Sequence, residues 1–142
     1  MDEARRLIGA LALTPHPEGG WYRQTWAARA EPGERPAGTA ILFLLRAGER
    51  SHWHRVDADE IWHFHAGGPL RLSVSQNAEG RARDLVLGPG VLTGEMPQIV
   101  VPAAHWQSAV PFGAWTLASC TVSPGFRFEG FELAPPGFDI PR

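Results

Sequence analysis

Glycine and proline recur along nearly the whole chain and divide it into short apolar runs. The 142 residues include 16 Gly and 13 Pro. Short apolar runs between such turn-forming residues are typical of many strands joined by turns. We therefore predict an all-β fold, of the kind found in jelly rolls and small barrels. The predicted strands cover residues 20–26, 39–45, 50–55, 60–65, 70–76, 82–87, 98–101, 106–110 and 115–122.

Residues 2–13 have the spacing of a helix. Leu7 and Leu11 recur one helical turn apart, and Asp2 is a suitable N-cap. Pro15 ends this helix. A chain of 142 residues lies within the usual range for one domain. The predicted single domain has three parts: a helix within residues 1–14, a barrel over 15–134 and a surface tail over 135–142.

The charged residues exclude several classes of function. The net charge is −2, so the chain has no basic field that would attract a nucleic-acid backbone. All 13 basic residues are Arg, which excludes chemistry through a lysine Schiff base. No apolar run reaches the roughly 18 residues that a membrane span needs. We expect neither nucleic acid nor a membrane as a partner.

The chain has a single cysteine, Cys120. Without a second thiol it cannot form an internal disulfide bond, and nothing in the composition indicates an oxidising compartment. We therefore predict a cytoplasmic protein. Cys120 lies in an apolar run and is predicted to be a small buried core residue, with a catalytic thiol as the alternative.

Residues 48–67 contain the pattern that points to a binding site. In an extended strand His52 and His54 point to the same face, while Trp53 points to the other. If the chain then turns back as an antiparallel strand, Glu60 can stand opposite both histidines. We therefore predict that these two histidines and this carboxylate line one pocket.

The strand after this turn presents two different faces. Trp62 and Phe64 share the face of Glu60, so we expect them to form pocket walls or core. His63 and His65 lie on the opposite face. They are predicted to belong to the outer surface of the sheet or to a subunit contact.

The same segment resembles the first motif of the cupin superfamily. That motif has Gly, then His-x-His, then Glu followed after six residues by Gly, and Glu60 and Gly67 keep the last spacing. The second cupin motif, Pro-x-Gly-x-x-His, has a partial counterpart in residues 102–107, where Ala104 replaces the glycine and Gln107 replaces the histidine. The resemblance implies a single cupin (jelly-roll) β-barrel, preceded here by the short N-terminal helix.

Further phrases are similar to one cupin family, an uncharacterised group often labelled predicted sugar epimerases. They occur in the right order over nearly the whole chain, so this match is more specific than a lone His-x-His pattern. The resemblance implies an epimerase or isomerase that acts on a sugar or nucleotide sugar, and a homodimer. The shared phrases are residues 16–23, 51–55, 59–63, 94–98, 120–126 and 128–133.

A divalent metal in the pocket is an open question at this point. His52, His54 and Glu60 would supply three ligands and would resemble two-histidine, one-carboxylate iron sites. The fourth ligand would be Gln107, whose neutral amide is a poor donor, or His105. The sequence therefore leaves open a site for Zn, Fe, Mn or Ni in a dioxygenase or hydro-lyase, whereas the epimerase hypothesis requires no cofactor.

Without a metal, the same residues can carry out proton transfer. His52 or His54 would take a proton from a carbon next to a carbonyl, and Glu60 would orient the imidazole. An epimerase also needs a donor on the opposite face of that carbon, and Tyr22, the only tyrosine, is the candidate. The alternative for Tyr22 is a barrel-wall residue whose hydroxyl is bonded to the backbone.

The remaining predicted residues contact the small-molecule ligand. A guanidinium can bind phosphate or carboxylate through two hydrogen bonds, and Arg23 is the candidate for this role. Two alternatives to the epimerase remain: the metal-dependent enzyme, and a small-molecule binding protein without catalytic activity. The predicted substrate-binding residues are Arg23, Trp62, Phe64, Gln98 and Gln107.

Overall fold

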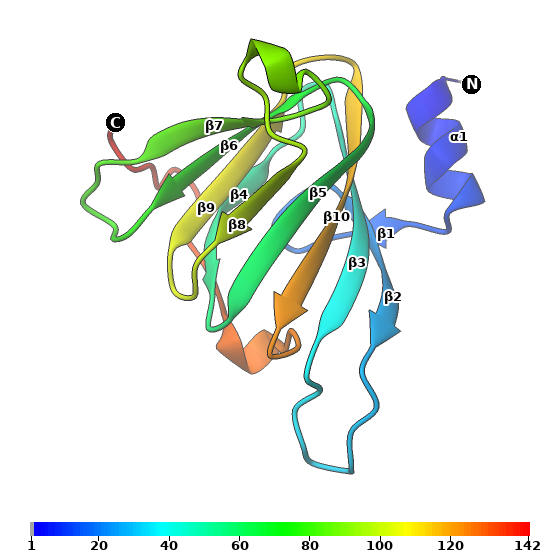
Figure 1. Cartoon of the computed structure of the whole chain (residues 1–142), viewed down its shortest axis with the longest axis vertical. Coiled ribbons are helices and arrows are strands. Elements are labelled where there is room, and N and C mark those ends of the chain that lie inside the picture. Colours follow the sequence, from blue (N-terminus) through cyan, green and yellow to red (C-terminus); the bar gives the residue numbers. More distant parts are fainter. Residues whose placement is uncertain (1) are drawn as a thin grey trace.

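Two antiparallel sheets packed face to face make up most of the molecule (Figure 1). The computed structural model describes residues 2–142. In hydrogen-bonding order, the first sheet consists of β1 (Thr14–Pro15), β2 (Trp21–Ala27), β3 (Thr39–Arg46), β10 (Trp115–Ser123), β5 (Asp59–Gly67) and β8 (Gln98–Val101). The second consists of β11 (Phe131–Leu133), β4 (Ser51–Val56), β9 (Trp106–Pro111), β6 (Leu70–Ser75) and β7 (Arg83–Leu87).

The predicted all-β fold is confirmed, but the two sheets are not closed into the predicted barrel. Each predicted strand is present, and its ends differ from the prediction by at most two residues. A barrel closes only when its edge strands pair continuously. Here the edge strand β7 meets the segment before β8 only through an isolated bridge between Leu87 and Met96. The two sheets therefore remain separate hydrogen-bonded units.

The elements that the sequence did not predict are all short. Strands β1 and β11 have two and three residues, and each of the two 3-10 helices, η1 (Val91–Thr93) and η2 (Phe128–Gly130), has three. Segments of this length show no hydrophobic period, so a pattern search cannot detect them.

The N-terminal helix α1 (Glu3–Ala10) is confirmed, although it is shorter than predicted. Asp2 caps it, because its carboxylate accepts a hydrogen bond of 2.7 Å from the backbone N–H of Arg5. The apolar face of α1 packs on the outer side of the first sheet around Leu44 and Leu117. Among residues 2–142, no helix is long and apolar enough to cross a membrane.

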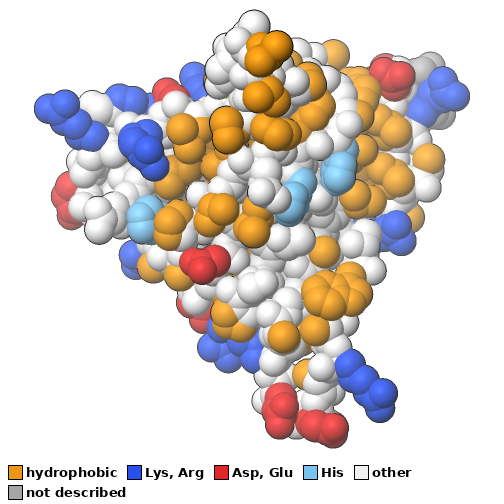
Figure 2. Space-filling model, in the orientation of Figure 1, with side chains coloured by type: hydrophobic (Ala, Val, Ile, Leu, Met, Phe, Trp, Pro, Cys, Tyr) orange, Lys and Arg blue, Asp and Glu red, His pale blue; other side chains and the backbone are white. Residues whose placement is uncertain are grey.

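The outer face of the first sheet beyond α1 is partly apolar, and Figure 2 shows hydrophobic and histidine side chains gathered on it. His65 Nε2 lies 2.8 Å from Ser119 Oγ, and His63 Nε2 lies 3.4 Å from Thr121 Oγ1. These contacts run along the surface of β5 and β10, so the predicted outer position of both histidines is confirmed. The homodimer remains a prediction for this face.

The C-terminal segment 135–142 follows the surface, where most of its residues are exposed, and Ile140 anchors it. Ile140 is fully buried against Trp53 and Trp106 on the outer side of the second sheet. The indole N–H of Trp53 also donates a hydrogen bond of 2.8 Å to Asp139 Oδ1. Trp53 thus faces away from the space between the sheets, as predicted, and the last residues cover it.

Strand β4 contains a bulge that changes which side chains face inward. Ser51 pairs with Ala109 and His54 pairs with Gln107, so three steps along β4 match two steps along β9. Ser51 and His54 therefore both face the space between the sheets. The strict alternation assumed from the sequence fails here, and His52 does not share the face of His54.

Candidate functional site

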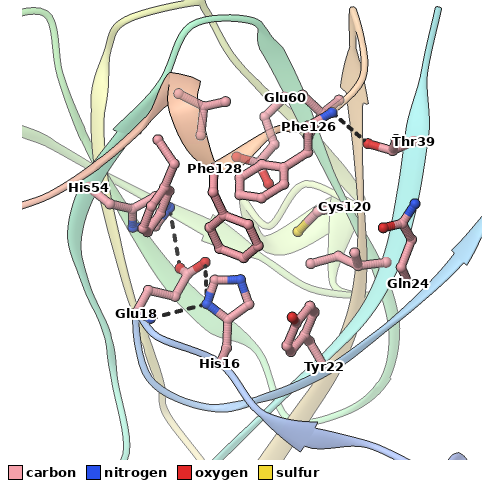
Figure 3. A pocket seen from close by; sticks show the side chains of 14 residues that line it. His16, Glu18, Tyr22, Gln24, Thr39, His54, Glu60, Cys120, Phe126 and Phe128 are labelled. Carbon is pink, nitrogen blue, oxygen red and sulfur yellow. Dashed lines mark hydrogen bonds and ion pairs between the residues drawn. The ribbon is translucent and has the colours of Figure 1, made fainter. Parts of the chain in front are cut away.

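A cavity of about 530 Å³, including its mouth, lies between the two sheets (Figure 3). One part of its wall is aromatic, and another carries four titratable side chains from the N-terminal loop and from β4 and β5. The lining residues are His16, Glu18, Tyr22, Gln24, Thr39, Ile41, His54, Val56, Glu60, Cys120, Val122, Phe126, Phe128 and Phe131.

A tight turn before β2 brings Glu18 into this cavity. Gly19 and Gly20 both have positive φ, at 110° and 77°. A Cβ at Gly19 would collide with the carbonyl oxygen of Arg50, so the turn can pass this close to β4 only with glycine there. The backbone N–H of His52 donates a hydrogen bond of 2.8 Å to Glu18 O. The turn is therefore fixed to the edge of the bulged strand.

Glu18 is the centre of a buried polar cluster. Its Oε2 accepts a hydrogen bond from the Ser51 hydroxyl and lies 3.2 Å from His54 Nε2, and its Oε1 lies 3.3 Å from His16 Nδ1. Burial raises the pKa of Glu18 to about 8. At pH 7 this side chain is therefore mainly a neutral carboxylic acid.

The hydrogen bonds of His54 define its tautomer. Its Nδ1 lies 2.7 Å from the carbonyl oxygen of His52. A carbonyl oxygen can only accept, so Nδ1 carries the hydrogen. Burial lowers the pKa of His54, and in the neutral ring Nε2 is then an acceptor that faces Glu18. The carboxylic acid of Glu18 and the imidazole of His54 thus share one proton, and both ring nitrogens are engaged.

His16 is a second neutral imidazole in the cluster. Its Nδ1 accepts a hydrogen bond of 3.1 Å from the backbone N–H of Glu18, and burial lowers its pKa to about 4. The ring contacts Tyr22 edge to face, with centroids 4.4 Å apart. His16 therefore positions both Glu18 and Tyr22.

Glu60 reaches the same cavity from β5 and is oriented by two side chains behind it. Gln107 Nε2 donates a hydrogen bond of 2.8 Å to Glu60 Oε1, and Trp62 Nε1 donates one of 2.8 Å to Gln107 Oε1. Because an indole N–H can only donate, the Gln107 amide must present its nitrogen to Glu60. Burial raises the pKa of Glu60 to about 7. Near neutral pH this carboxyl can therefore both give and take a proton.

Three of the predicted catalytic residues line the cavity: Tyr22, His54 and Glu60. The fourth, His52, does not. Because of the bulge its side chain lies outside, where Nε2 is 3.0 Å from the carbonyl oxygen of Pro135. The predicted pairing of His52 and His54 in one pocket is therefore wrong.

The predicted substrate-binding residues do not line the cavity. Arg23 is exposed, because neighbouring residues of β2 alternate faces and Tyr22 takes the inner one. Gln98 is exposed on β8, with its Nε2 3.3 Å from His63 Nδ1. Gln107 supports Glu60 from behind. The two aromatic candidates, Trp62 and Phe64, belong to the core between the sheets.

Sequence reasoning missed Glu18 and His16. Both lie in the phrase 16–23, where a histidine and a glutamate precede a Gly-Gly pair. The signal available in the sequence was this pair of titratable residues placed directly before two glycines. Cys120 also lines the cavity, and burial raises the pKa of its thiol well above the usual value. It is therefore an uncharged wall residue and not an activated nucleophile.

The predicted metal ligands do not form a centre. His52 points away, both amide atoms of Gln107 are already hydrogen-bonded, and the Nδ1 of His105 is 3.4 Å from the carbonyl oxygen of nearby Ala103. Within residues 2–142, no group of three or more His, Cys, Asp or Glu side chains is arranged to hold a metal ion. The donor set does not fit the two-histidine, one-carboxylate site that the sequence left open.

Comparison with known proteins identifies the family. Residues 5–134 match the family described as Cupin superfamily (DUF985). The chain belongs to the cupin superfamily. The cupin is 40% identical to protein SO0799 from Shewanella oneidensis, with a TM-score of 0.87 over 94% of this chain and 85% of that chain. It is 32% identical to a hypothetical protein from Leishmania major, with a TM-score of 0.86 over 96% of this chain and 90% of that chain.

Other cupins share only the fold with this chain. Oxalate decarboxylase from Bacillus subtilis is 16% identical, with a TM-score of 0.64 over 84% of this cupin and 29% of that chain. No curated protein matches the chain. The cupin fold is thus established, and the chemistry has to be argued from the cavity.

We expect this cupin to lose stability as the pH rises from about 6.5 to about 8.5. In the folded state Glu18 and Glu60 have pKa values of about 8 and about 7, against 4.5 for an ordinary glutamate. The folded protein therefore binds more protons than the unfolded chain, and raising the pH favours unfolding. The expected loss is on the order of 2 kcal/mol, measured by urea denaturation at the two pH values.

The variants Glu18→Gln and Glu60→Gln are the controls for this dependence, since each removes one of the two groups. The lowered pKa of His16, about 4, acts with the opposite sign but only below about pH 6.5. A free energy of unfolding that stays constant across this pH range would contradict the raised pKa values of the two carboxyls. The same contradiction would follow if both variants kept the pH dependence of the unmodified protein.

Proposed function

We propose that this cupin is an epimerase or isomerase that moves a proton on a carbon next to a carbonyl group in a small sugar-like molecule. The observation that carries the proposal is Glu60, a buried carboxyl that faces the cavity and has a pKa of about 7. A general base is most effective when its pKa lies near the working pH. The hydrogen bond from Gln107 also holds this carboxyl in one orientation before substrate arrives.

In this proposal Glu60 is the base, and not a histidine. His54 engages one ring nitrogen with the backbone of His52 and the other with Glu18. To take a substrate proton it would have to give up one of these contacts. His54 instead acts on Glu60 through charge, because any positive charge on its ring lowers the pKa of Glu60. The Glu18–His54 pair thus adjusts the strength of the base.

Tyr22 is the proposed acid for the opposite face of the substrate carbon. In Figure 3 it lies across the cavity from His54, and its strand, β2, is a different strand from β5, which carries Glu60. When the C–H bond breaks, its proton passes to Glu60. The Tyr22 hydroxyl then gives a proton to the other face of the carbon, after which solvent returns a proton to Tyr22 and takes one from Glu60. These two proton transfers invert the configuration of the carbon without a cofactor.

The lining residues favour an uncharged substrate. No arginine is among the described residues that line the cavity, so a phosphate group would find no cation there. The aromatic side of the cavity, formed by Phe126, Phe128 and Phe131, suits the apolar face of a sugar ring. We therefore propose that a sugar moiety enters the cavity and that any nucleotide part stays outside.

Solvent deuterium exchange tests this function. The protein is incubated in D₂O with neutral aldoses and ketoses and, separately, with keto-sugar nucleotides, and proton NMR follows the loss of signal at the carbon next to the carbonyl. We expect exchange with at least one neutral sugar. No exchange with any compound, together with saturable binding of one of them, would instead favour a binding protein without catalytic activity.

The Tyr22→Phe variant separates epimerisation from simple exchange. We expect formation of the inverted sugar to slow by about 10²–10⁴-fold, while exchange with retention through Glu60 continues. The matched control is Phe64→Leu, a similarly conservative change at an aromatic residue that packs against the core and does not line the cavity. Unchanged epimerisation in Tyr22→Phe would reject Tyr22 as the acid.

A further inference from the structure

A second pocket lies on the outer face of the second sheet, away from the cavity. Its volume is about 650 Å³ including its mouth, and it is bounded by β6, β9 and the C-terminal segment. Leu70 and Leu72 point into the core, so Arg71 between them points outward. Arg50 and Arg142 line the same pocket. Three guanidinium groups therefore converge there.

Arg71 has an unused hydrogen-bond donor. Its Nε is buried and has no hydrogen-bond partner among the described residues. Leaving a charged donor buried and unpaired is unfavourable. An anion held by the outer nitrogens of Arg71 would compensate the charge of this guanidinium.

The two carboxylates in the pocket already have partners. Asp84 Oδ1 accepts hydrogen bonds of 2.6 Å from the Ser73 hydroxyl and 3.2 Å from Arg142 Nε. Asp139 Oδ1 accepts the indole N–H of Trp53. Neither Arg50 nor Arg71 forms a side-chain ion pair or hydrogen bond with the residues described here. Three cations against two carboxylates leave the pocket with a net positive charge.

We propose that this pocket binds a phosphate group through Arg71 and Arg50. A guanidinium offers donors in a planar fork that fits the oxygens of phosphate. A dianion with several acceptor oxygens can meet two guanidinium groups at once, whereas a carboxylate has only two oxygens. Ser108, which also lines the pocket, adds a hydroxyl. The phosphate is either the free ion or the monoester group of a small metabolite, and the site is independent of the proposed catalytic cavity.

Arginine side-chain NMR at low ionic strength tests the proposal. Inorganic phosphate and glycerol phosphate are titrated separately into ¹⁵N-labelled protein, with potassium chloride at matched ionic strength as the control. We expect the Nε–H signal of Arg71 to shift in a saturable way with phosphate and not with chloride. Tighter binding of glycerol phosphate would identify the monoester as the ligand, and tighter binding of inorganic phosphate would identify the free ion.

Arginine variants complete the test. Arg71→Gln should weaken phosphate binding at least about tenfold, the loss expected when one charge-assisted pair is removed. Arg50→Gln, at an exposed position, should weaken it as well, which keeps the test valid if Arg71→Gln does not fold. Arg23→Gln, on the outer side of the other sheet, should leave binding unchanged. The same response to chloride as to phosphate, or unchanged affinity in both pocket variants, would overturn the proposal.

Discussion

Replacing Glu60 by Gln should slow proton exchange at the substrate carbon by about 10²–10⁴-fold. The amide has nearly the same shape as the carboxyl and can still accept the hydrogen bond from Gln107, so the cavity should keep its form. It cannot take up a proton at neutral pH. The effect should therefore appear in kcat with little change in KM, measured by the same exchange experiment in D₂O.

Two matched variants control this result. Glu132→Gln makes the same chemical change at an exposed carboxylate that pairs with Arg55 on the surface, and it should leave the rate unchanged. His52→Gln should also leave it unchanged, because the His52 side chain lies outside the cavity. If His52→Gln were as slow as Glu60→Gln, the base would have to be assigned again to the histidine pair.

Replacing Gly19 by Ala should lower the free energy of unfolding by about 2–5 kcal/mol. Two costs add: the left-handed backbone conformation of a residue with φ of 110°, and the collision of the new Cβ with the carbonyl oxygen of Arg50. The turn that carries His16 and Glu18 would have to move away from β4. We therefore expect exchange activity to fall together with stability, which urea denaturation measures.

Gly48→Ala is the matched control for this change. Gly48 has φ of 85°, and a Cβ added there would have no heavy atom within 4 Å, so only the conformational cost applies. The expected loss there is about 1–2 kcal/mol. Equal losses in the two variants would mean that the close approach to β4 adds nothing, and the turn would then owe its position to the Glu18 cluster alone.

The strands and the helix could be predicted from the sequence because their signals are local. Alternation of polar and apolar residues between turn residues predicted nine strands, and the ends of each lie within two residues of the observed ends. Asp2 marked the start of α1 in the same way. Short elements such as β1 carry no period and were missed. Closure of the barrel depends on pairing between distant edge strands, which no local pattern contains.

The composition of the candidate site could be predicted from the sequence only in part, because most of its contacts depend on the tertiary structure. The sequence identified Glu60 and His54, but one extra residue in β4 turned His52 away, and a bulge has no clear signature in a strand of alternating residues. Glu18 and Ser51 are 33 residues apart, and only the folded chain brings them together. The raised pKa values of Glu18 and Glu60 come from burial between the sheets. Residue types and spacing are properties of the sequence, whereas burial and contact between distant segments exist only in the folded protein.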